Sequence, residues 1–117
     1  MFLGRYEHTI DEKGRITIPA RFRDLLDEGA YVTRGFDNNL LVLTPPSFDI
    51  ISQRVRQMSI TDEAARLLKR LIFSSAERVE VDRNGRILIP QWLRASVGIE
   101  NAAVVVGAGE YFEIWSP

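Results

Sequence analysis

The chain has 117 residues and no cysteine, and this absence removes several kinds of protein from consideration. Without thiols there are no disulfides and no thiolate-bound metal centres, and a reducing cytoplasm is the compartment that we expect. The single histidine, His8, has no second histidine or cysteine with which to build a metal site. The sequence therefore predicts no metal site and no cofactor.

Long apolar runs are also missing. Residues 102–106 are one of the longest fully apolar stretches, whereas a membrane-spanning helix needs about 18 such residues. The opening MFLGRYEHTI turns polar at once and lacks the apolar core of a secretory signal peptide. We therefore expect no membrane partner.

Catalytic motifs are equally scarce. No nucleophile motif accompanies His8, and no glycine-rich phosphate-binding loop occurs. The interpretation that follows is a protein without catalytic residues, without enzymatic activity and without a small-molecule ligand.

The chain has almost no net charge, at −1, with an isoelectric point near 5.8. Nucleic-acid-binding domains are often strongly basic, which argues mildly against this class. Binding needs only one basic face, however, so the distribution of charge matters more than its sum. Residues 1–23 carry five Lys or Arg against three Asp or Glu.

What the sequence does contain is a long internal repeat. Residues 11–23, DEKGRITIPARFR, return 71 positions later as residues 82–94, DRNGRILIPQWLR, with seven of thirteen positions identical. A repeat of this length indicates two related structural units. The identical pairs are Asp11/Asp82, Gly14/Gly85, Arg15/Arg86, Ile16/Ile87, Ile18/Ile89, Pro19/Pro90 and Arg23/Arg94.

The first copy predicts a β-hairpin with a charged tip. Asp at the first and Gly at the fourth position of residues 11–14 is typical of a type I turn, in which the Asp side chain accepts a nearby backbone N–H. Residues 15–18 then alternate with period two, so that the isoleucines face inward and Arg15 faces outward. In the second copy Arg86 faces outward in the same way.

The rest of each unit is predicted to be a short helix after the proline and two further strands. Two helices lie between the units, the first capped by Ser47 and the second by Ser59 or Thr61. The predicted organisation is unit 1 at residues 5–46, a two-helix connector at 47–75 and unit 2 at 76–117. Units of about 40 residues are too small to fold alone. We therefore expect one globular α+β, mainly β domain with a pseudo-two-fold axis and equivalent turn tips.

The pattern D-x-x-G-R-[IL]-x-I-P, present twice, resembles the MraZ family, whose members carry two tandem SpoVT-AbrB motifs. The resemblance includes the opening MFLGRYEHTIDEKGR and the ending V-V-G-x-x-x-[YF]-F-E-[IL]-W at residues 105–115. It implies two AbrB-like units in a swapped-hairpin, or double-split, barrel. The family's D-x-x-x-R signature falls on Asp11/Arg15 and Asp82/Arg86.

The resemblance also implies a function. Members of the MraZ family are bacterial transcriptional regulators that form ring-shaped homo-oligomers and bind double-stranded DNA at short direct repeats in promoters. Their targets include the division and cell-wall gene cluster that contains their own gene. The expected location is the cytoplasm, associated with the nucleoid.

Arg15 and Arg86 are the principal candidates for DNA contact, because a guanidinium fork matches both phosphate and guanine. The alternative is an internal ion pair with Asp11 and Asp82, four residues earlier across each turn. Both interpretations can hold together, since a carboxylate can fix an arginine in the rotamer that reads DNA.

Lys13 and Arg83, at the turn tips, are either supporting phosphate contacts or solvated charges. The residues expected to shape the turns are Asp11, Gly14, Asp82 and Gly85.

A second function stays open, namely a protein-interaction or antitoxin-like module that acts through oligomerisation and a protein partner. The apolar stripes of the central helices suit either packing on the barrel or contacts between subunits.

Overall fold

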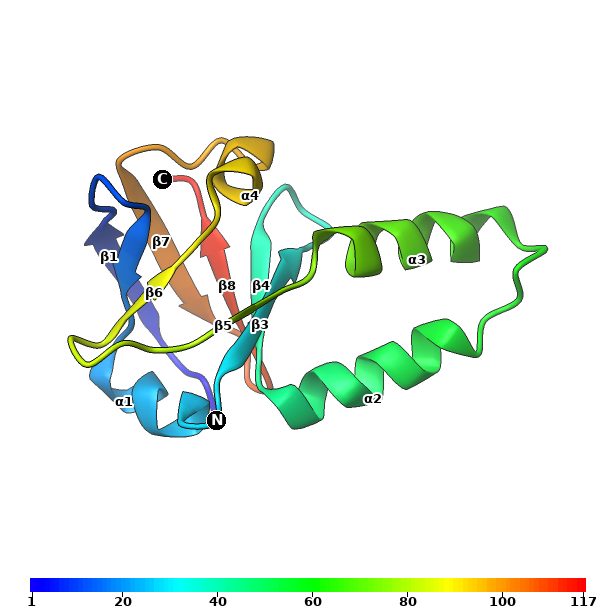
Figure 1. The fold of residues 1–117 in the computed structure, drawn as a ribbon, viewed down its shortest axis with the longest axis horizontal. Coiled ribbons are helices and arrows are strands. Elements are labelled where there is room, and N and C mark those ends of the chain that lie inside the picture. Colours follow the sequence, from blue (N-terminus) through cyan, green and yellow to red (C-terminus); the bar gives the residue numbers. More distant parts are fainter.

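The computed structural model describes residues 1–117 as a small barrel from which two helices project as an arm (Figure 1). In chain order the elements are β1 (Arg5–Thr9), β2 (Arg15–Thr17), α1 (Ala20–Arg23), the 3₁₀ turn η1 (Asp24–Leu26), β3 (Ala30–Arg34), β4 (Leu40–Leu43), α2 (Pro45–Arg56), α3 (Glu63–Ser75), β5 (Glu77–Val79), β6 (Arg86–Leu88), α4 (Gln91–Ser96), β7 (Ala102–Gly107) and β8 (Phe112–Trp115). The predicted α+β, mainly β class is therefore confirmed.

The strands form two antiparallel sheets with an internal symmetry. One sheet has the order β1-β7-β8-β4-β3-β5, and the other is a two-stranded ribbon of β2 and β6. Reading the six-stranded order backwards exchanges β1 with β5, β7 with β3 and β8 with β4, which are the pairs that the repeat relates. The two halves of the chain are thus related by a pseudo-two-fold axis, as tandem AbrB-like units require.

The predicted hairpin, in which the strand before each turn pairs with the strand directly after it, is wrong. Strand β2 forms its ladder with β6 of the other half, while β1 pairs with β7 and β5 with β3. Between β1 and the return strand only an isolated bridge joins Ile10 and Ile16. The alternating pattern identifies which face of a strand is buried but not which strand lies beside it.

A single core holds both halves together. Nineteen buried apolar residues from the two halves form one cluster, in which Ile16, Ile18, Ile87 and Ile89 are all fully buried. Three aromatic side chains pack against Phe22, which is fully buried in this core. The ring centroid of Phe22 lies 5.1 Å from that of Phe2, 5.5 Å from that of Tyr6 and 5.1 Å from that of Phe112.

The arm consists of helices α2 and α3, which lie antiparallel and extend away from the sheet (Figure 1). Helix α2 begins earlier than predicted, because Thr44 caps it by accepting the N–H of Ser47, and both prolines fit its first turn. Helix α3 is capped by Asp62, whose side chain accepts the N–H of Ala64, and not by Ser59 or Thr61.

Helix α3 is joined to strand β3 by a buried hydroxyl pair. The side-chain oxygens of Thr33 and Ser75 lie 2.8 Å apart, and Thr33 also donates to the backbone oxygen of Ile72 at 3.2 Å. Both hydroxyls are almost completely buried, so these hydrogen bonds fix where the arm leaves the barrel. None of the helices has the length and apolar character needed to cross a lipid bilayer.

Candidate nucleic-acid interface

The two copies of the repeat meet in the β2–β6 ribbon. In its register Arg15 lies opposite Leu88, Ile16 opposite Ile87, and Thr17 opposite Arg86. The two isoleucines point into the core and are fully buried. The remaining four side chains therefore share the outer surface of the ribbon, which we call the ribbon face: Arg15, Thr17, Arg86 and Leu88.

Each end of the ribbon is closed by one of the two predicted turns. The Oδ1 atom of Asp11 accepts the backbone N–H groups of Lys13 at 3.0 Å and Arg15 at 2.9 Å. The equivalent atom of Asp82 accepts those of Asn84 at 2.8 Å and Arg86 at 3.0 Å. Because β2 and β6 run antiparallel, the two turns flank opposite ends of the ribbon.

Asp11 connects the arginines of both repeats. Its Oδ2 atom accepts a hydrogen bond from Arg15 Nε at 2.7 Å and another from Arg86 Nη1 at 3.3 Å. Asp82 makes a weaker contact, with its Oδ2 atom 3.6 Å from Arg86 Nε. The internal ion pair considered for these arginines is therefore present, and it joins the two halves of the chain.

Both aspartates are held in the ionised form. The backbone N–H of Arg15, its side chain and the N–H of Lys13 lower the pKa of Asp11 from 3.8 to about 2. The backbone N–H of Arg86 is likewise the largest cause of a lowered pKa at Asp82. At neutral pH both carboxylates are charged and hold the arginines in place.

The ion pairs leave donors free on the ribbon face. The side chains of Arg15 and Arg86 are 30% and 25% exposed. Arg15 uses only Nε within the chain, so both of its terminal nitrogens can donate outward. Arg86 retains Nη2, because Nη1 is directed at Asp11. Lys13 and Arg83 are exposed in the turns at either end of the ribbon.

Two further arginines support the turns, although the repeat alone predicts no role for them. Arg23 donates from Nε to the backbone oxygen of Ile18 at 2.9 Å, and Arg94 donates to that of Ile89 at 3.0 Å. Their guanidinium groups cover the turn glycines of the opposite half, Arg23 over Gly85 and Arg94 over Gly14.

The sequence does mark these two arginines, because Arg23 and Arg94 are one of the identical pairs of the repeat. A Cβ atom on Gly14 would lie 2.6 Å from Arg94 Nη2, and Gly14 itself has a φ of +87°. Glycine is therefore required at this turn both by its backbone conformation and by the guanidinium packed on it. The partner lies in the other half of the chain, which is why spacing did not reveal it.

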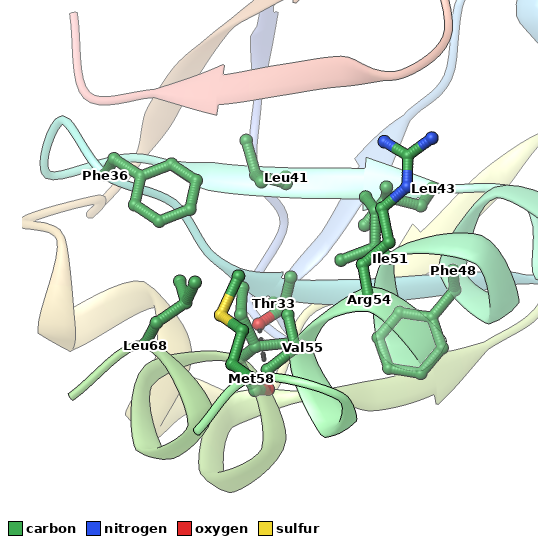
Figure 2. Close-up of a pocket in the computed structure, with 11 residues that line it drawn as sticks. Thr33, Phe36, Leu41, Leu43, Phe48, Ile51, Arg54, Val55, Met58 and Leu68 are labelled. Atoms are coloured by element: carbon green, nitrogen blue, oxygen red, sulfur yellow. Dashed lines mark hydrogen bonds between the residues drawn. The ribbon is translucent and has the colours of Figure 1, made fainter. Parts of the chain in front are cut away.

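The most apolar hollow lies elsewhere, between the arm and strands β3 and β4 (Figure 2). It has a volume of about 240 Å³ and no residue of the ribbon face. Side chains from the strands, such as Leu41, face those from the helices, such as Val55 and Leu68 (Figure 2). His8, half-buried on β1, belongs neither to this hollow nor to the ribbon face.

Comparison with known proteins gives a consistent family relationship. The family model described as "MraZ protein, putative antitoxin-like" matches residues 1–71 and again residues 72–117. A protein of Roseiflexus castenholzii named "Transcriptional regulator MraZ" is 50% identical over 117 residues, which is 100% of this chain and 82% of that protein. Proteins of the same name from Thermomicrobium roseum and Ligilactobacillus salivarius are 48% and 41% identical, covering 100% and 99% of this chain and 82% and 81% of their own lengths.

Proposed function

The chain belongs to the MraZ family, and from this membership and the ribbon face we propose that it is a transcriptional regulator that binds double-stranded DNA through that face. The observation that carries the proposal is the pair Arg15 and Arg86, brought from the two repeats to one outward surface with free guanidinium donors. The relatives are named as regulators, which is not a class of enzyme.

The ribbon face suits the major groove of DNA. A two-stranded antiparallel ribbon fits this groove and can present side chains to base edges. The terminal nitrogens of Arg15 form a fork that can donate to O6 and N7 of one guanine. Lys13 and Arg83, in the turns at the two ends of the ribbon, would contact phosphates and position the protein without selecting a sequence.

Asp11 has a supporting role in this proposal. Its carboxylate holds both arginines before DNA arrives, so less side-chain entropy is lost on binding. Because Asp11 occupies one terminal nitrogen of Arg86 but none of Arg15, we propose that Arg15 makes the stronger base contact.

One chain is not enough for tight binding. The proposed contacts involve three or four cationic side chains, so a single ribbon face should bind weakly and with strong salt dependence. We propose a ring-like homo-oligomer that presents several ribbon faces to direct repeats in a promoter. Matched spacing would raise the affinity by about 10² or more. The proposed targets are promoters of the division and cell-wall genes, including the protein's own, at the nucleoid in the cytoplasm.

The test compares arginine variants on DNA that the wild-type protein selects from a random duplex pool. Arg15→Ala and Arg86→Ala should each weaken binding by about 1–3 kcal/mol per lost base contact and lower the salt slope by about 1 per lost phosphate contact. Arg56→Ala is the matched control, because Arg56 is an exposed arginine on the arm. Binding that survives unchanged in the Arg15→Ala/Arg86→Ala double variant would refute the assignment of the ribbon face.

The apolar hollow supports a second candidate, a protein-interaction or antitoxin-like module. It is lined mostly by hydrophobic side chains and includes Phe36, which is 66% exposed, and Met58, which is 38% exposed. Failure of the protein to select any DNA would favour this candidate if Met58→Glu also disrupts assembly in sedimentation. Unchanged assembly in Met58→Glu would count against it.

A further inference from the structure

One side chain of the ribbon face differs in character from the others. Leu88 is the only apolar residue among Arg15, Thr17, Arg86 and Leu88, and it is 51% exposed. It lies directly opposite Arg15 in the register of β2 and β6. Side chains opposite each other on one face of an antiparallel pair are in contact range, so Leu88 adjoins the arginine proposed to read guanine.

The fold does not require an apolar side chain at this position. Thr17 occupies the equivalent position in the first copy of the repeat, on the same face of the same ribbon. The inward-facing neighbours, Ile16 and Ile87, supply the core on both strands. A leucine exposed to water between two arginines therefore contributes little to packing, and its side chain is available to contact another molecule.

The contact available to this leucine in a major groove is the methyl group of thymine. Among the major-groove edges of the four bases, only thymine presents a methyl group, and apolar side chains recognise it. Resting on the proposed function, we infer that Leu88 contacts a thymine methyl beside the base bound by Arg15, and so determines part of the sequence that the protein selects.

This contact would also make the two halves of the ribbon face bind DNA differently, so that the protein distinguishes the two orientations of an element. A face with exact two-fold symmetry would select a palindromic element, because the symmetry of the site mirrors that of the protein. The two halves here present Thr17 at one position and Leu88 at its equivalent. The turns differ as well, with Glu12 and Lys13 where the second copy has Arg83 and Asn84. Each element is then read in one orientation, which suits elements arranged as direct repeats.

The experiment uses a duplex that the full-length wild-type protein selects from a random pool. Each thymine is replaced in turn by deoxyuridine, which removes only the methyl group. At one thymine the wild-type protein should lose about fourfold in affinity, the value of one buried methyl group. In Leu88→Ser, whose side chain carries no methyl group, the affinities for the thymine and deoxyuridine duplexes should become equal to each other. Thr17→Leu is the matched variant, and should gain sensitivity at the pseudo-symmetric position.

The outcomes separate this inference from the proposed function. Selection of DNA with no deoxyuridine effect, or with the same effect in Leu88→Ser, overturns the role of Leu88 and leaves DNA binding intact. A change of oligomer mass in Leu88→Ser without any change in the deoxyuridine profile also overturns it, because Leu88 would then contact another subunit. If no DNA is selected at all, the proposed function fails, and the role of Leu88 fails with it.

Discussion

The docking of Arg23 on Gly85 predicts that alanine at this glycine is unusually costly. Gly85 has a φ of +76°, and a Cβ atom there would collide with the guanidinium of Arg23. Gly98 provides a matched comparison, because its φ is +71° and nothing lies within 4 Å of the position of its Cβ. The two substitutions share the same backbone strain and differ in the displaced arginine.

The expected magnitudes follow from these two contributions. The left-handed conformation costs an alanine about 1–2 kcal/mol, which is the whole loss expected for Gly98→Ala. Gly85→Ala also displaces Arg23, whose Nε donates to the oxygen of Ile18 at 2.9 Å. A hydrogen bond from a charged donor is worth about 1.5–3 kcal/mol. The total expected for Gly85→Ala is about 2.5–5 kcal/mol.

Urea denaturation of the single and double variants measures this coupling. In the Arg23→Ala background the cost of Gly85→Ala should fall to that of Gly98→Ala, because the displaced hydrogen bond is already gone. Gly14→Ala should behave in the same way with Arg94→Ala. Equal losses for Gly85→Ala and Gly98→Ala, or an unchanged loss in the Arg23→Ala background, would refute the proposed role of the guanidinium.

Two further predictions concern acid stability and the shared core. The pKa of Asp11 is lowered from 3.8 to about 2, so the stability from its carboxylate is complete above about pH 4 and is lost as the pH falls toward 2. Asp11→Asn should therefore lose less stability than the wild type between pH 4 and 2 in urea titrations, and parallel curves would contradict this. Phe22→Ala should cost about 3–5 kcal/mol in one cooperative transition, since Phe22 is fully buried in the core that both halves share, whereas Phe36→Ala, at a 66% exposed side chain, should cost little. Two separate unfolding transitions would indicate that the halves have independent cores.

Local chemistry made the turns and the outward direction of the arginines predictable. Asp11 and Gly14 bracket a turn whose hydrogen bonds lie within four residues. The alternation around Arg15 shows which side chains face the core, because the side-chain direction of a strand reverses at every residue. Because residues 82–94 repeat residues 11–23, both conclusions also apply to Arg86.

The helix starts were less predictable, because several candidate caps lay close together. Ser59 and Thr61 are both good capping residues by composition, yet Asp62 caps α3. Ser47 was the predicted cap of α2, yet Thr44 caps it, because the two prolines that follow Thr44 fit the first turn of the helix.

The printed sequence is enough to identify two related units, the buried faces of their strands and the residues that form their turns. The folded chain shows in addition that β2 pairs with β6, that Asp11 holds arginines from both repeats, and that Arg23 covers Gly85. Strand pairing and ion pairing between residues about 70 positions apart depend on how the two halves bury their apolar faces against each other. Period and spacing along the chain report the faces of each strand, and they contain no information about its neighbour.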